Sequence, residues 1–187
     1  MVRELICPSP AMGGAILAVM LAVAGGLPAA AEESGQWFGR AVIVTVSSKT
    51  VNVGDRADHI ISVSETDGVV FNGDGKPFLD KARYQIADWS DGATRIGYKT
   101  FTETDGSKVF AKYTLKEAKL PDLHGVFEFT GGTGKYAGIT GHGEYHVVLV
   151  SDTAAWDELH GEYSIPAAAS GSSTPPAAPG MTTSTGK

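Results

Sequence analysis

The chain has 187 residues, of which 24 are glycine, nine are proline and one is cysteine. Because 42% of the residues are hydrophobic and only 19% are charged, the chain can bury a core. Its glycine and proline content stays below the roughly 25–30% that is typical of disordered chains, so a folded domain is expected. The formal charge of −6 repels phosphate backbones and anionic headgroups, which argues against binding nucleic acid or a membrane surface.

The N-terminal segment has the order of a secretory signal peptide. Arg3 precedes an apolar stretch over residues 12–27, and the small residues Ala29–Ala31 follow it. A retained membrane anchor is the alternative, but it needs about 20 continuous apolar residues, and glycines interrupt this stretch. We expect residues 1–31 to be removed together with Cys7, which leaves a cysteine-free protein in the periplasm or outside a bacterial cell, with no membrane attachment after cleavage.

Residues 32–165 are predicted to form one all-β domain, because their apolar residues recur with period two rather than 3.6. Aspartate-glycine pairs at Asp67, Asp91 and Asp105 are typical of tight turns between strands. A short helical turn over 154–159 is the competing interpretation of one segment. The eight or nine predicted strands are 41–46, 59–65, 69–71, 82–88, 94–101, 108–115, 125–130, 144–150 and 159–165.

Strands at this regular spacing indicate a sandwich or a barrel, and we expect an antiparallel eight-stranded β-barrel because closure removes exposed sheet edges. The C-terminal residues 166–187 are rich in Pro, Ala, Ser and Thr. They contain almost nothing whose burial would offset the entropy of ordering, so we expect a disordered tail.

The most distinctive motif is the glycine-rich segment from Phe127 to Tyr145, which contains Gly-Gly-Thr-Gly-Lys-Tyr-Ala-Gly-Ile-Thr-Gly. It lacks the spacing of a phosphate-binding P-loop, and no helix follows as a dinucleotide site requires. A strand, this motif and another strand resemble the allene oxide cyclase and dirigent-type barrels, most closely their exported bacterial members. Segments 63–67 and 94–98 are similar to further strands of that family. The resemblance implies a calycin-like eight-stranded barrel, often oligomeric, with an apolar cavity.

The resemblance also implies a catalytic carboxylate at Glu65, although Asp67 replaces the asparagine of the plant enzymes. A carboxylate inside an apolar barrel would have a raised pKa and could serve as an acid or base, whereas exposure to solvent near the strand end is the alternative. We expect ligand-binding aromatic residues to line the barrel, namely Tyr98, Phe110, Phe127 and Tyr145.

A metal site is considered at His142, Glu144 and His146, which alternate along one strand and share a face. Residues two apart on a strand are separated by roughly 6.5–7 Å, which is wide for three ligands of one ion. A solvated polar face is favoured, and the other histidines show no metal-ligand spacing. The sequence therefore predicts no metal and no cofactor.

The leading hypothesis is an exported barrel that binds a small hydrophobic ligand. The alternatives are a structural or interaction module whose barrel is filled by side chains, and an isomerase or cyclase that uses Glu65. The inward-facing side chains discriminate between an open and a filled barrel. The sequence leaves open whether the protein is an enzyme and whether it self-associates.

Overall fold

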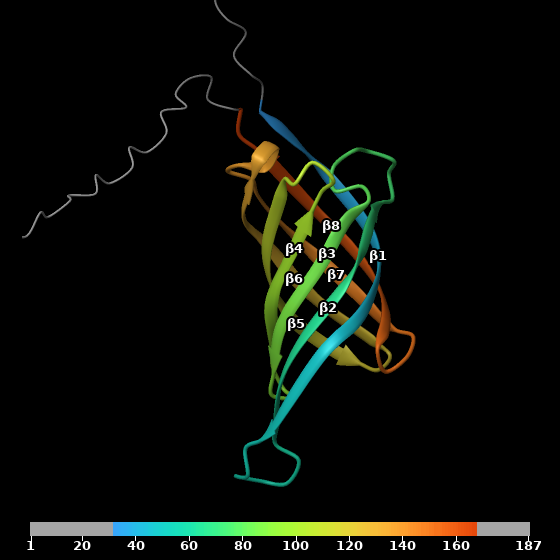
Figure 1. Cartoon of the computed structure of the whole chain (residues 1–187), viewed down its shortest axis with the longest axis vertical. Helices are drawn as coiled ribbons and strands as arrows, with labels where there is room; N and C mark the ends of the chain where they lie inside the picture. The colour runs from blue at the N-terminus through green and yellow to red at the C-terminus, as the bar shows by residue number, and fades with distance from the viewer. Residues whose placement is uncertain (1–31, 168–187) are drawn as a thin grey trace, which may run out of the picture.

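The computed structural model describes residues 32–167, which form a closed antiparallel barrel with the strand order β1-β2-β3-β4-β5-β6-β7-β8 (Figure 1). The predicted signal peptide and residues 168–187 of the predicted tail lie outside the described residues. The strands are Glu33–Asn52 (β1), Ile60–Asn72 (β2), Ala82–Ser90 (β3), Arg95–Thr102 (β4), Lys108–Lys119 (β5), Asp122–Thr133 (β6), Thr140–Leu149 (β7) and Ala154–Ile165 (β8).

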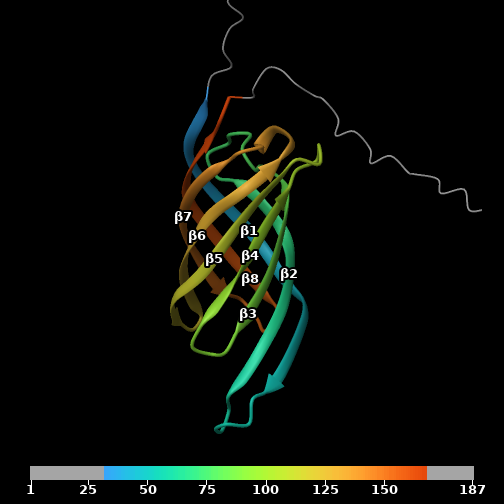
Figure 2. The ribbon, with the colours of Figure 1, turned by 90° about the vertical axis from the view of Figure 1, so that its left-hand side faces the viewer.

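The first and last strands close the barrel, with Glu33 paired to Ile165 and Val44 paired to Ala154. The barrel has two distinct ends (Figures 1 and 2). The terminal end carries both ends of the described chain and a short 3-10 helix, Gly134–Tyr136 (η1). At the opposite hairpin end, β1 and β2 extend beyond the other strands. No helix among residues 32–167 is long and apolar enough to span a membrane.

Aromatic side chains fill the terminal end of the barrel. Trp37 is almost fully buried and packs edge to face against Phe78, Phe101 and Phe127. Phe78 also stacks on Tyr163, with 3.8 Å between ring centroids. Because these rings contribute large apolar areas and interlock edge to face, this half of the barrel is a packed core.

The glycine-rich motif covers this filled end. It runs from the end of β6 through η1 into β7 (Figure 1). Tyr136 is buried there against Phe78, and its hydroxyl donates a hydrogen bond to Glu103. Lys135 pairs with the same carboxylate. The part of the motif around η1 is therefore a structural cover in this chain, and it lies away from the hairpin end.

Several local predictions are confirmed, one predicted turn is wrong, and one competing interpretation is excluded. Gly92 and Gly106 lie in turns with left-handed φ values of 86° and 84°. The predicted turn at Asp67 does not form, because β2 continues through it in register with β1 and Asp67 binds Arg83 on the next strand. The two segments predicted on either side of it are therefore one strand, which gives eight strands. Residues 154–159 belong to β8 rather than to a helical turn.

Candidate functional site

The hairpin end of the barrel encloses a cavity of about 420 Å³. Apolar side chains from several strands line its walls, namely Ile43, Ile86, Leu115, Leu123, Val147 and Leu149. Hydroxyl groups lie among them and toward the rim, from Ser48, Ser62, Ser64, Ser90, Ser151 and Thr153. The cavity is therefore amphipathic, with apolar side chains from β1, β3, β5, β6 and β7 and hydrogen-bonding groups among them.

A buried ion pair lies between this cavity and the aromatic core. The ammonium of Lys99 on β4 is 3.0 Å from Oδ2 of Asp157 on β8, and their side chains are only 1% and 0% exposed. The hydroxyl of Tyr84 donates a hydrogen bond of 2.8 Å to the same oxygen. Oδ1 of Asp157 has no hydrogen-bond partner among the described residues. Such a pair requires close partners, because removing two charges from water is unfavourable.

Three tyrosine rings surround the Lys99 ammonium. Its Nζ lies 4.2 Å from the ring centroid of Tyr145 and 5.2 Å from those of Tyr84 and Tyr113. Burial lowers the pKa of Lys99, while attraction to Asp157 opposes that shift. Burial and the neighbouring carboxylates raise the pKa of all three phenols. The arrangement holds a cation against π faces and keeps the phenols protonated as hydrogen-bond donors.

A second carboxylate organises the cavity wall. Asp88 on β3 accepts hydrogen bonds from Ser64 at 2.6 Å, from Tyr113 at 2.7 Å and from Nη2 of Arg95 at 2.7 Å. Burial opposes the charge on Arg95, but its hydrogen bond to Asp88 prevails and raises the arginine pKa. Arg95 is one-third exposed and borders the cavity. A guanidinium that is paired with the buried Asp88 therefore lies on this wall as a hydrogen-bond donor.

Two glycines make room for the tyrosines of the site. Gly97 is paired with Tyr113, and Gly125 is paired with Tyr145. A Cβ atom at Gly97 would lie 2.8 Å from Cε1 of Tyr113, and one at Gly125 would lie 2.4 Å from Cε1 of Tyr145. Those distances are shorter than van der Waals contact, so each ring occupies space that only a glycine leaves on the neighbouring strand.

The predicted ligand-binding residues are divided among three places. Tyr145 lines the cavity, whereas Phe127 belongs to the aromatic core at the filled end. Tyr98 is 62% exposed on the outer face, and Phe110 is partly exposed between the inward-facing Val109 and Ala111. Strand alternation explains why Tyr98 and Phe110 lie outside, because residues one apart point to opposite faces, whereas Phe127 and Tyr145 both face inward at different levels of the barrel. Of the four, the cavity contains Tyr145 alone.

Glu65 lies on the outer face and is exposed, while its neighbours Ser64 and Thr66 are buried and face the cavity. The desolvated surroundings that would adapt Glu65 to acid or base chemistry are therefore not present at its position. Asp67 does not join it at the cavity either, because its carboxylate binds Arg83. Glu65 is one residue away from Ser64 and from Thr66, so its side chain points to the opposite face of the strand from those that line the cavity.

Sequence reasoning missed the ion pair at the centre of the site. Lys99 has the same strand parity as Gly97 and Phe101, and Asp157 has the same parity as Leu159. A charged residue at an inward position of a strand was the available signal, because buried lysine and aspartate are rare unless they are paired. Nothing in the sequence identifies these two as partners, since 58 residues separate them.

No protein-family model and no curated protein sequence matches this chain. Among solved structures it is similar to the pterocarpan synthase dirigent protein GePTS1, with a TM-score of 0.48 and 12% identity over 73% of this chain and 87% of that one. The pterocarpan synthase dirigent protein PsPTS1 gives a TM-score of 0.45 and 12% identity, over 72% and 95% of the two chains. This likeness concerns the barrel fold alone.

Proposed function

We propose that the protein binds one small amphipathic molecule in the cavity at the hairpin end. The observation that carries the proposal is the difference between the two halves of the barrel: aromatic rings fill one half, and the other encloses about 420 Å³. This volume lies within the range of small-molecule sites, roughly 300–1,000 Å³. Apolar walls with a few fixed polar groups are also typical of such sites.

The polar groups favour a ligand with an oxygen-rich end. Lys99 and Arg95 are hydrogen-bond donors that are each paired with a carboxylate, and the hydroxyl of Tyr145 has no side-chain hydrogen-bond partner among the described residues. A carboxylate, enol or phenol oxygen would accept hydrogen bonds from such donors, while the hydrocarbon part contacts Ile43 and Leu123 on the walls. This refines the expectation of a purely hydrophobic ligand.

The alternative of a filled barrel describes the terminal end only. There Trp37 and its neighbouring rings leave a packed core. The isomerase or cyclase alternative rested on a buried Glu65, and that side chain is exposed. Binding is therefore the function that the geometry supports best.

The test uses 8-anilino-1-naphthalenesulfonate, an anion with apolar rings, as a fluorescent probe. We expect saturable binding at one site per chain. Ser62→Trp would place an indole in the cavity and abolish the binding, whereas Val63→Trp, one residue along on the outer face, is the matched control and would retain it. Equal binding by both variants, or no saturable binding by the parent protein, would contradict the proposal.

A second measurement addresses the chemistry of the ligand. Arg95→Met removes the positive charge that borders the cavity and keeps much of the side-chain length. We expect it to weaken binding of the anionic probe more than binding of neutral 1-aminonaphthalene. Native mass spectrometry of the purified protein would then show a bound molecule of small mass, which denaturation releases.

A further inference from the structure

A row of charged and titratable residues crosses four strands on the outer face of the barrel. In register, Glu117 on β5 is opposite His124 on β6, His124 is opposite His146 on β7, and His146 is opposite Glu158 on β8. Two imidazoles thus lie side by side, and each has a carboxylate on its other flank. This row is separate from the cavity, which the inward-facing residues line.

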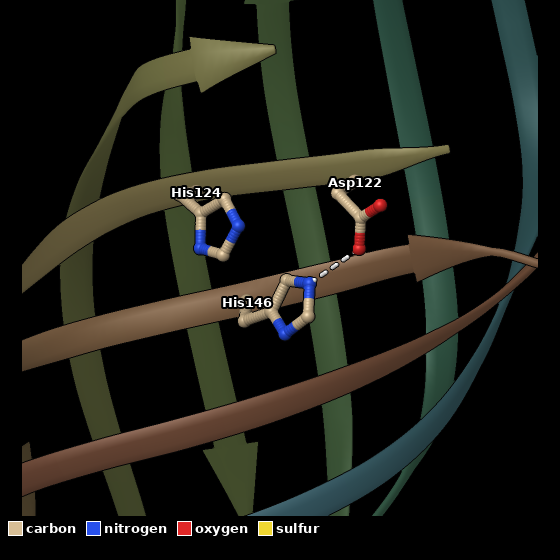
Figure 3. A group of neighbouring side chains, drawn as sticks. All are labelled: Asp122, His124 and His146. Atoms are coloured by element: carbon tan, nitrogen blue, oxygen red, sulfur yellow. Dashed lines mark hydrogen bonds and ion pairs between the residues drawn. The ribbon is translucent and has the colours of Figure 1, made fainter. Parts of the chain in front are cut away.

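The two histidines share a third potential ligand. Their rings are nearly parallel, with an interplanar angle of 8° and centroids 4.2 Å apart. Asp122 precedes His124 by two residues on the same strand, and its Oδ1 lies 2.7 Å from Nε2 of His146 (Figure 3). One ligand atom from each of the three residues lies within 4.8 Å of the others.

We propose that Asp122, His124 and His146 bind one divalent transition-metal ion, of the zinc or copper class. Imidazole nitrogen suits zinc, copper and nickel, and two imidazoles with one carboxylate leave coordination positions open to water or to another ligand. The order of affinity expected for such a site places Cu²⁺ above Zn²⁺.

The side chains of Asp122, His124 and His146 need only modest rotation to coordinate one metal ion. Metal–ligand bonds of about 2.0–2.2 Å place tetrahedral donors about 3.3 Å apart, so no donor pair has to close by more than about 1.5 Å. His124 is exposed and Asp122 and His146 are partly exposed, so their side chains have room to turn. The paired strands meanwhile hold the backbone in register. The flanking carboxylates Glu117 and Glu158 are paired with Lys119 and Arg40, so the Asp122 carboxylate is the anionic ligand of the group.

The site differs from the set considered along a single strand. His142, Glu144 and His146 are spaced by two residues on β7, roughly 6.5–7 Å apart. Directly opposite residues on neighbouring antiparallel strands have Cβ atoms about 4.5–5.5 Å apart. The cross-strand partner His124 therefore supplies a second imidazole close to His146. The two histidines are 22 positions apart in the sequence, and only the strand pairing brings them together.

The test is calorimetric titration of Zn²⁺ into untagged protein carrying Cys7→Ser, so that the one thiol does not contribute. We expect one ion per chain, a loss of about tenfold or more in affinity for His124→Ala and for Asp122→Asn, and no response to Mg²⁺ or Ca²⁺. His142→Ala is the control, because His142 is also exposed beside a carboxylate, Glu162, but is not part of the three-residue group.

Spectroscopy gives a second readout. With Cu²⁺, electron paramagnetic resonance should show two nitrogen ligands in the parent protein and one in His124→Ala. Urea unfolding confirms that the variants are folded, which is expected for exposed positions. Unchanged zinc affinity in His124→Ala, equal losses in His124→Ala and His142→Ala, or no binding by the parent would overturn the proposal.

Discussion

The buried pair Lys99 and Asp157 predicts opposite pH dependences for the loss of either partner. At 3.0 Å and an effective dielectric constant of about 20, their attraction is about 5–6 kcal/mol, which offsets the removal of both groups from water. When one partner is lost, the other can keep its charge in the interior or become neutral. The smaller of these two free-energy costs determines the destabilisation.

Asp157→Asn leaves Lys99 without its counterion, while Tyr84 can still donate to the amide oxygen. Neutralising a lysine of ordinary pKa requires about 4–5 kcal/mol at pH 7 but only about 2 kcal/mol at pH 9. Burial already lowers the pKa of Lys99, so neutralisation is the accessible outcome. Because the unfolded variant then binds more protons than the folded one, its stability should rise between pH 7 and pH 9.

Lys99→Met is expected to show the opposite dependence of stability on pH. The remaining carboxylate of Asp157 can be protonated, which requires about 4 kcal/mol at pH 7 and about 1.5 kcal/mol at pH 5. The folded variant then binds more protons than the unfolded one, so its destabilisation relative to the parent should shrink as the pH falls from 7 to 5.

The assay is urea unfolding at pH 5, 7 and 9, followed by tryptophan fluorescence, to which Trp37 contributes from the buried core. The double variant Lys99→Met with Asp157→Leu is the control, since replacing a whole buried pair is much less destabilising than breaking it. Destabilisations that do not change with pH, or a double variant as unstable as both single variants combined, would refute the assignment of Lys99 and Asp157 as a charge pair.

Two further predictions concern the tyrosines. Burial raises the pKa of Tyr84, Tyr113 and Tyr145, so the folded state holds their protons more tightly than the unfolded state does. Their contribution to the free energy of unfolding should therefore be fully present below about pH 10 and should fall above it. Absorbance at 295 nm should rise together with unfolding, and ionisation of these phenols before unfolding would contradict this. Gly125→Val would place Cβ 2.4 Å from a backbone oxygen and from the ring of Tyr145. We expect the free energy of unfolding in urea to fall by about 3 kcal/mol, against less than about 0.5 kcal/mol for Val126→Ala on the outer face. Similar losses in the two variants would refute the packing argument.

The strand pattern predicted the fold class because alternation of apolar residues survives in every strand of a one-sided sheet. It located two turns correctly, at Gly92 and Gly106. The turn predicted at Asp67 failed because pairing with β1 on one side and with Arg83 on the other outweighed the local preference. Local signals of this kind yield to tertiary pairing wherever a strand is held on both edges.

The candidate site was harder to predict because its members depend on register. Tyr145 was expected in the cavity and lies there, but Lys99 and Asp157 come from strands far apart in sequence. Likewise, His124 showed no metal-ligand spacing along the chain, and only the pairing of β6 with β7 places it opposite His146.

The sequence by itself indicated an all-β domain over residues 32–165, a sandwich or a barrel of eight or nine strands, because its apolar residues alternate with period two between turn residues. Only the tertiary structure decided which half of that barrel is hollow and which charges meet. Closure fixes the register of all eight strands at once, and a shift of one residue would exchange the inner and outer faces of a strand. That is why Glu65 lies in solvent while Ser64 and Thr66 face the cavity.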